Sequence, residues 1–207
     1  MDTTIITMRD DKAARGLRNL VQFLHHRYEN GFVMVEIGSY AGESTEIFAQ
    51  HASKIYAVDP WVSGYDPNDI ASNSDMILAE KEFDHRMQKY ANIKKLKMTS
   101  AEAINSFEDQ SVDIVYIDGN HTYDAVKFDI QSWLPKIKLN GMVAGHDYYH
   151  KGVNRAIHYT IGKPDLVFED KSWLKSAKEA QKSSLLKRIS YRIFVNALFI
   201  RDKAKRM

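Results

Sequence analysis

Residues 32–45 read FVMVEIGSYAGEST, and this stretch decides the fold. The run 32–37 is apolar apart from Glu36, which is typical of a strand buried on both faces of a parallel sheet. Gly38 follows the strand directly and Gly42 comes four residues later, so we expect a tight turn that leads into a helix. A buried strand followed by a glycine turn and a helix indicates an α/β domain.

Outward from this stretch, strand and helix patterns alternate along the chain. Helical spacing of apolar residues predicts a helix over 13–28. Residues 59–75 are rich in Pro, Gly, Ser, Asn and Asp, and predict a long loop of the kind that covers binding sites. The alternation predicts a mostly parallel sheet with helices on both faces. Further strands are expected over 55–58, 93–98, 112–117, 141–145 and 166–168 and at Trp173, and further helices over 43–51, 76–90, 101–107, 123–137 and 153–160.

The composition excludes several classes of site. The chain has 207 residues, enough for one domain with a real core. It has no cysteine, so disulfides, thiolate zinc sites and cysteine nucleophiles are excluded, and any metal must bind oxygen or imidazole. The first residues lack the pattern of a signal peptide, and no apolar run approaches the roughly 18 residues of a membrane span. We therefore expect a cytoplasmic protein.

The charge is unevenly distributed. Residues 171–207 contain eleven Lys or Arg and two acidic residues and carry +9, whereas the remainder carries −7. This contrast predicts a domain over 1–175 and a basic helical extension over 176–207. The amphipathic pattern of 176–200 suits peripheral contact with an anionic membrane. The alternative, which we favour, is packing on its own domain or on another subunit of a homo-oligomer. No nucleic-acid partner is expected, because the body is acidic and no base-reading motif is present.

Carboxylates follow four of the predicted strands. In open α/β sheets, ligands bind beyond the carboxyl ends of the strands, so we expect these side chains to share one rim. Clustered carboxylates repel one another, which predicts a cationic group among them. Asp59 lies 21 residues after Gly38, at the end of the second strand, where an acidic residue is suited to bind ribose hydroxyls. The alternative is that the Asp59 carboxylate only caps the turn that follows. The four residues are Glu36, Asp59, Asp118 and Asp147.

Four segments, in order along the chain, resemble one enzyme family. They are VEIGSYAGEST (35–45), YAVDPW (56–61), YIDGNHTYD (116–124) and GMVAGHDY (141–148). Together they resemble the class I S-adenosylmethionine-dependent methyltransferases, and more narrowly the bacterial O-methyltransferases that include macrocin-type and other antibiotic-sugar enzymes. The resemblance covers about residues 30–175. It implies a Rossmann-like fold with seven strands, the last one antiparallel, and S-adenosylmethionine as the cofactor.

The resemblance also implies roles for individual residues. Asp118, His146 and Asp147 match the positions that hold a divalent cation in metal-dependent relatives. An imidazole ligand favours Mn²⁺ or another transition metal over Mg²⁺, and a site without metal stays open as the alternative. The methionine part of the cofactor would contact Glu36, Gly38, Ser39 and Gly42, and its ribose would contact Asp59. Its adenine would lie near Trp61, Ser100 and Ala101. Its methyl group would lie near Asp118.

The reaction expected is methyl transfer to a hydroxyl of a small molecule or a sugar, with a phenol or catechol as a further acceptor class. Asp118, His121 and His146 are the candidates for the chemistry. The ordinary pKa of histidine, about 6.5, suits a general base, although His121 is equally suited to orient its loop through a backbone hydrogen bond. Two alternatives are a non-catalytic cofactor-binding or scaffold protein and an NAD-dependent oxidoreductase. The glycine spacing disfavours the second, because dinucleotide dehydrogenases use G-x-G-x-x-G.

Overall fold

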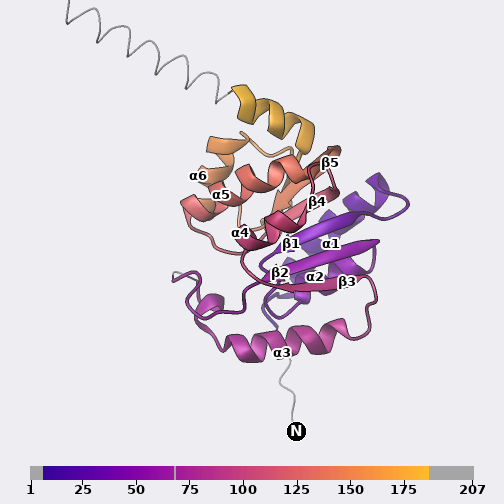
Figure 1. Cartoon of the computed structure of the whole chain (residues 1–207), viewed down its shortest axis with the longest axis vertical. Helices are drawn as coiled ribbons and strands as arrows, with labels where there is room; N and C mark the ends of the chain where they lie inside the picture. The colour runs from indigo at the N-terminus through magenta and orange to yellow at the C-terminus, as the bar shows by residue number, and fades with distance from the viewer. Residues whose placement is uncertain (1–6, 68, 187–207) are drawn as a thin grey trace, which may run out of the picture.

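The computed structural model describes residues 7–67 and 69–186, and its centre is one sheet (Figure 1). Seven strands form it in the order β3-β2-β1-β4-β5-β7-β6. β1 to β5 pair in parallel with one another, whereas β7 pairs antiparallel with both β5 and β6. The strands are β1 (Val33–Ile37), β2 (Lys54–Asp59), β3 (Ile93–Lys97), β4 (Val112–Ile117), β5 (Ile137–Gly145), β6 (Leu166–Val167) and β7 (Trp173–Ser176).

Six labelled helices surround the sheet. Polar residues begin several of them: Asp10 accepts a hydrogen bond from the backbone N–H of Ala13 at the start of α1, and Thr122 accepts one from Ala125 at the start of α5. The helices are α1 (Asp11–Arg27), α2 (Glu43–Ala49), α3 (Met76–Met87), α4 (Ser100–Ala103), α5 (Tyr123–Trp133) and α6 (Lys151–Thr160).

Both faces of the sheet are covered, as the buried strand pattern predicts. Alternate residues of β1 point to opposite faces: Met34 packs in a core with α1 and α2, and Val35 packs in a core with α5 and α6. α3 lies at the β3 end of the molecule, and α6 lies toward the other end (Figure 1). The order of the strands changes direction between β1 and β4, which is the point where open α/β sheets leave a crevice for ligands.

Several predicted elements have different bounds in the structure, and three of them have a clear physical reason. β5 begins at Ile137 rather than 141, because the buried Ile137 pairs with Val112 and the exposed Leu139 and Asn140 continue the strand to Gly141. The helix predicted over 101–107 is the short α4 followed by a 3-10 turn, Ile104–Ser106. The helix predicted over 123–137 ends at Trp133, where Pro135 enforces a 3-10 turn.

The predicted boundary at 175/176 falls inside the last strand. β7 includes Ser176, and the helical residues 177–186 that follow bury Ala177 and Ala180 in the main core. The start of the predicted extension therefore packs on its own domain. The rest of the predicted basic helix, 187–207, lies outside the described residues, and its membrane and oligomer contacts stay predictions. Within 7–67 and 69–186, no helix is long and apolar enough to cross a membrane.

Candidate active site

The turn after β1 needs glycine because a second loop passes close by. Gly38 has φ +87°, a conformation that side chains rarely adopt, and a Cβ at this position would collide with the backbone carbonyl of Asp118. The loops that follow β1 and β4 therefore touch at this point. This contact brings the predicted cofactor turn next to the carboxylate that ends β4.

Glu36 lies beneath this turn, on the side away from the cavity that the turn lines. Its carboxylate is fully buried and accepts hydrogen bonds from the hydroxyls of Ser39 (2.9 Å) and Thr45. Burial raises the pKa of Glu36 to about 7, against the opposing effect of these hydrogen bonds. Glu36 thus holds the turn and the start of α2 together, and it does not line the cavity above the turn.

Asp59, at the end of β2, both caps a turn and faces the site. Its carboxylate accepts hydrogen bonds from the backbone N–H groups of Tyr40 (3.0 Å) and Trp61 (2.7 Å), and burial raises its pKa despite them. Asp59 also lines the cavity of the site. The structure does not bring Trp61 to the site: its indole packs against Phe83 (ring centroids 5.0 Å apart) under α3.

Ser100 faces the site at the end of β3, whereas Ala101 is exposed and does not line it. The Ser100 hydroxyl donates to Asp129 Oδ1 (2.5 Å) and accepts from the indole N–H of Trp133 (2.8 Å). Burial raises the pKa of Asp129 to about 6. Sequence reasoning missed Asp129, because it lies inside a helix with no motif around it.

Asp59, Ser100 and Asp129 line one cavity of about 290 Å³. The turn 38–42 and Asp59 form part of its wall, and residues of the long loop 61–75 form another part. Asp118, His121, His146 and Asp147 line the same cavity. The strand-end carboxylates predicted to share one rim therefore do so, apart from Glu36, which supports the rim from below.

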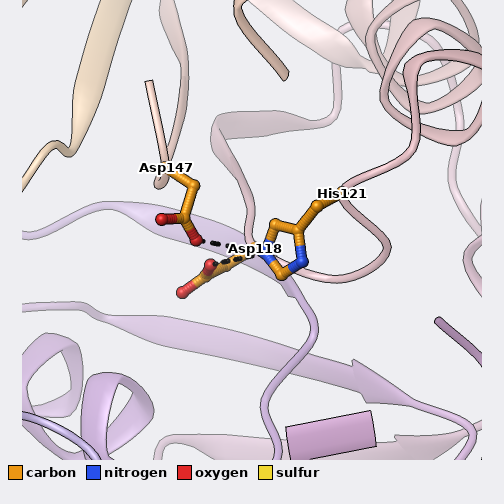
Figure 2. Close-up of side chains that lie close together, drawn as sticks. All are labelled: Asp118, His121 and Asp147. Carbon is orange, nitrogen blue, oxygen red and sulfur yellow. Dashed lines mark ion pairs between the residues drawn. The ribbon is translucent and has the colours of Figure 1, made fainter. Parts of the chain in front are cut away.

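Asp118, His121 and Asp147 form a compact cluster at the ends of β4 and β5 (Figure 2). Each offers one ligand atom, and these atoms lie within 4.8 Å of one another. His121 Nε2 lies 3.2 Å from Asp147 Oδ2 and 3.8 Å from Asp118 Oδ1, but has no hydrogen bond of normal geometry among the described residues. Although burial lowers the pKa of His121, the two carboxylates raise it to about 11.

His146 lies beside this cluster. Its Nδ1 is 3.1 Å from Asp147 Oδ2 and 3.6 Å from Asp118 Oδ1. Burial lowers the pKa of His146, but these carboxylates outweigh it and the net shift is upward. All three residues predicted to hold a metal therefore meet in space. The group of side chains whose ligand atoms converge among the described residues, however, contains His121 in place of the predicted His146, whose Nδ1 is already hydrogen-bonded to Asp147.

The side chain of Arg9 places a positive charge among these carboxylates. Its guanidinium donates to Asp118 Oδ2 (3.0 Å) and lies 3.4 Å from His146 Nε2 and 3.9 Å from Asp170 Oδ2. Its side chain is only 12% exposed. Sequence reasoning predicted a cation here but not this residue, because nothing in the N-terminal segment marks Arg9 for contact with strand ends more than 100 positions away.

The donor set fits a divalent cation. Two carboxylates and one imidazole converge, and an imidazole nitrogen without a normal hydrogen bond points toward both carboxylates (Figure 2). Binding would displace the proton that the carboxylates stabilise on His121, because only the neutral imidazole ligates metal. Arg9 occupies Oδ2 of Asp118, so Oδ1 remains directed at the cluster.

A family model described as a methyltransferase domain, Methyltransf_24, matches residues 35–148. A curated relative, the uncharacterized protein y4gI of Sinorhizobium fredii, is 31% identical over 120 residues. That match covers 55% of this chain but 13% of y4gI, so the chain spans only a small part of the relative's length.

Solved structures show the same fold at low sequence identity. The O-methyltransferase NovP superposes with a TM-score of 0.62 at 14% identity, over 82% of this chain and 81% of NovP. Cofactor-bound Rv0187 from MTB gives 0.58 at 13% identity, over 85% and 84%. An rRNA methylase from Streptococcus thermophilus gives 0.55 at 14% identity, over 82% and 96%. The chain therefore belongs to the Methyltransf_24 family of methyltransferase domains and has the fold of the class I S-adenosylmethionine-dependent methyltransferases.

Proposed function

We propose that this chain transfers a methyl group from S-adenosylmethionine to a hydroxyl oxygen of a small molecule or a sugar, assisted by a divalent cation. One observation carries the proposal: a single cavity joins the turn 38–42 and Asp59 to the Asp118–His121–Asp147 cluster. The first group of residues suits a ribose-containing, positively charged cofactor. The cluster suits an oxygen acceptor beside a metal ion.

At the cofactor end, the chain offers backbone and carboxylate groups. The absence of a side chain at Gly38 allows a ligand to approach the backbone closely. Asp59 lines the cavity, and its carboxylate can accept a hydrogen bond from a ribose hydroxyl. Ser100 and its partner Asp129 line the cavity after β3, where the adenine is expected.

At the acceptor end, methyl transfer breaks a carbon–sulfur bond, forms a carbon–oxygen bond and releases the hydroxyl proton. We assign the proton to His146, which in its neutral form is a base, and whose Nδ1 lies 3.1 Å from Asp147. That carboxylate stabilises the imidazolium that forms. Asp118, His121 and Asp147 would hold the cation, which when bound supplies Lewis acidity that lowers the pKa of a coordinated hydroxyl. The cavity walls keep the acceptor oxygen and the methyl carbon in line.

Metal-independent methyl transfer is the second candidate. Arg9 favours it, because this buried guanidinium already neutralises part of the carboxylate charge. Its contact with Asp118 Oδ2 also orders the site in the absence of a metal.

The test combines binding and turnover. We expect calorimetry to detect S-adenosylhomocysteine binding, and a screen of sugar and phenol acceptors to detect methyl transfer that EDTA abolishes and Mn²⁺ or Mg²⁺ restores. Asp118→Ala should retain the fold but lose turnover, whereas the exposed control Asp109→Ala should behave as wild type. Unchanged activity in EDTA favours the metal-independent candidate. Tight binding of NAD without binding of S-adenosylhomocysteine would refute both.

A further inference from the structure

The described residues of the loop 61–75, which are 61–67 and 69–75, form a folded wall of the cavity. Within it, the backbone N–H of Gly64 donates to the carbonyl of Ser72 (2.8 Å), and the backbone N–H of Asp66 donates to the Ser72 hydroxyl (2.7 Å). These bonds bring the two arms of the loop together. Its residues that line the cavity are Val62, Tyr65, Asp66, Asp69, Ala71 and Ser72.

Two neighbouring contacts fasten this loop to the segment that follows β4. The Asn120 amide donates to the backbone carbonyl of Tyr65 (2.8 Å), and the backbone N–H of His121 donates to Asp66 Oδ2 (2.8 Å). Asp66 is 2% exposed. A carboxylate so deeply buried is costly unless hydrogen bonds satisfy it, so this contact constrains the loop strongly.

The same carboxylate also faces the ring of His121. Oδ2 of Asp66 lies 3.4 Å from His121 Nδ1, while Nε2 of that ring faces Asp147 and Asp118. The imidazole of His121 thus lies between the carboxylate of Asp66 on one side and the carboxylates of Asp118 and Asp147 on the other. Metal-ligating histidines characteristically use the second ring nitrogen in this way, and the partner carboxylate fixes the tautomer and the orientation of the ring.

We propose that Asp66 is a positioning residue that couples the cofactor to the cation: a cofactor that packs against loop 61–75 stabilises the Asp66 contact, and this contact aims His121 Nε2 at the cation. The coupling rests on the proposed function. It requires the cofactor and the cation to bind with positive cooperativity, and by linkage each ligand must strengthen the other by the same factor.

The test measures Mn²⁺ affinity by electron paramagnetic resonance with and without saturating S-adenosylhomocysteine, and S-adenosylhomocysteine affinity by calorimetry with and without Mn²⁺. For the wild type we expect both affinities to rise by the same factor, roughly 10-fold within the usual 5–150-fold range of such coupling. Asp66→Asn keeps an oxygen for the backbone N–H of His121 but loses the charge. It should weaken Mn²⁺ binding in the presence of S-adenosylhomocysteine by about 10–100-fold and bring the coupling factor close to 1.

Asp109→Asn is the control. Asp109 is an exposed carboxylate that pairs with Lys136 and does not line the cavity. It should keep the coupling factor of the wild type. Asn120→Asp serves as a second variant in case Asp66→Asn does not fold. It removes the donor to Tyr65 and should lower the coupling factor at least about two-fold.

The outcomes separate this inference from the proposed function. Mn²⁺ binding that is equally strong with and without S-adenosylhomocysteine overturns the coupling and leaves the proposed function intact. Full coupling in Asp66→Asn, or in Asn120→Asp if the first variant does not fold, also overturns it. A wild type that binds S-adenosylhomocysteine but no Mn²⁺ overturns both the coupling and the cation's part in the proposed function.

Discussion

The buried carboxyl of Glu36 should make the stability of this protein depend on pH in a way that one substitution removes. Glu36 lies under the turn 38–42 with no exposed surface, and burial raises its pKa from 4.5 to about 7. Glu36→Gln preserves the size of the side chain and an oxygen that accepts from Ser39 or Thr45, but it cannot ionise. The variant therefore isolates the free energy of ionising this group in the folded chain.

The magnitude follows from the shift. Below about pH 4.5 the carboxyl is protonated in both the folded and the unfolded chain, so its contribution to stability is fully present. As pH rises, the unfolded chain ionises first, and stability is lost until the folded group ionises near pH 7. At about 1.4 kcal/mol per pKa unit, the wild type should lose roughly 3 kcal/mol relative to Glu36→Gln across this window, with no further change above it.

The assay is urea denaturation of the wild type and Glu36→Gln at several pH values between about 4 and 8. Taking the difference between the two proteins cancels the other titrating groups. Glu108→Gln removes an exposed carboxylate and should show no such difference. A difference between wild type and Glu36→Gln that stays constant within about 0.5 kcal/mol from pH 5 to pH 8 would refute the reasoning, because Glu36 would then ionise at its ordinary pKa.

Three further substitutions test the site. Gly38→Ala should destabilise the fold by about 3 kcal/mol in urea, because it adds an unfavourable positive φ to a collision with the carbonyl of Asp118; a loss below about 1 kcal/mol would mean that the two loops do not touch. Arg9→Ala should cost about 3 kcal/mol in the same assay, because it leaves buried carboxylates unpaired, and Arg9→Lys should restore part of this; equal stability of all three proteins would contradict the buried ion pair. Asp59→Ala should weaken S-adenosylhomocysteine binding roughly tenfold or more by calorimetry, and an unchanged affinity would restrict Asp59 to its role in the turn.

Much of the fold could be predicted from local patterns. The apolar run before Gly38 predicts a strand buried on both faces, and the structure confirms the covered sheet. The antiparallel β7, which the structure also confirms, is expected from the family resemblance and not from a local pattern. Element bounds were less predictable where pairing rather than composition extends an element. The first residues of β5 are an example, since Ile137 joins the sheet through its pairing with Val112.

The candidate site likewise contains residues that the sequence predicts and residues that only the folded structure places. Asp59, Asp118 and Asp147 each follow a predicted strand, and the parallel arrangement alone implies that they share a rim. Trp61 follows a strand as well, but its positive φ of 48° and its packing against Phe83 turn the indole away from the cavity. A position along the chain gives the edge of the sheet that a residue reaches, but not the direction of its side chain.

Local sequence patterns were enough to predict the α/β architecture, the rim of strand-end carboxylates and the need for a cation among them. These properties depend on hydrophobic periodicity and on the geometry common to all parallel sheets, and both are encoded locally. Only the tertiary structure showed that Arg9 supplies one such cation, that His121 converges with Asp118 and Asp147, and that Asp66 reaches this histidine from a distant loop. The Asp66 and Arg9 contacts join residues that are 55 and 109 positions apart. Their specificity lies in packing and burial, which no local pattern records.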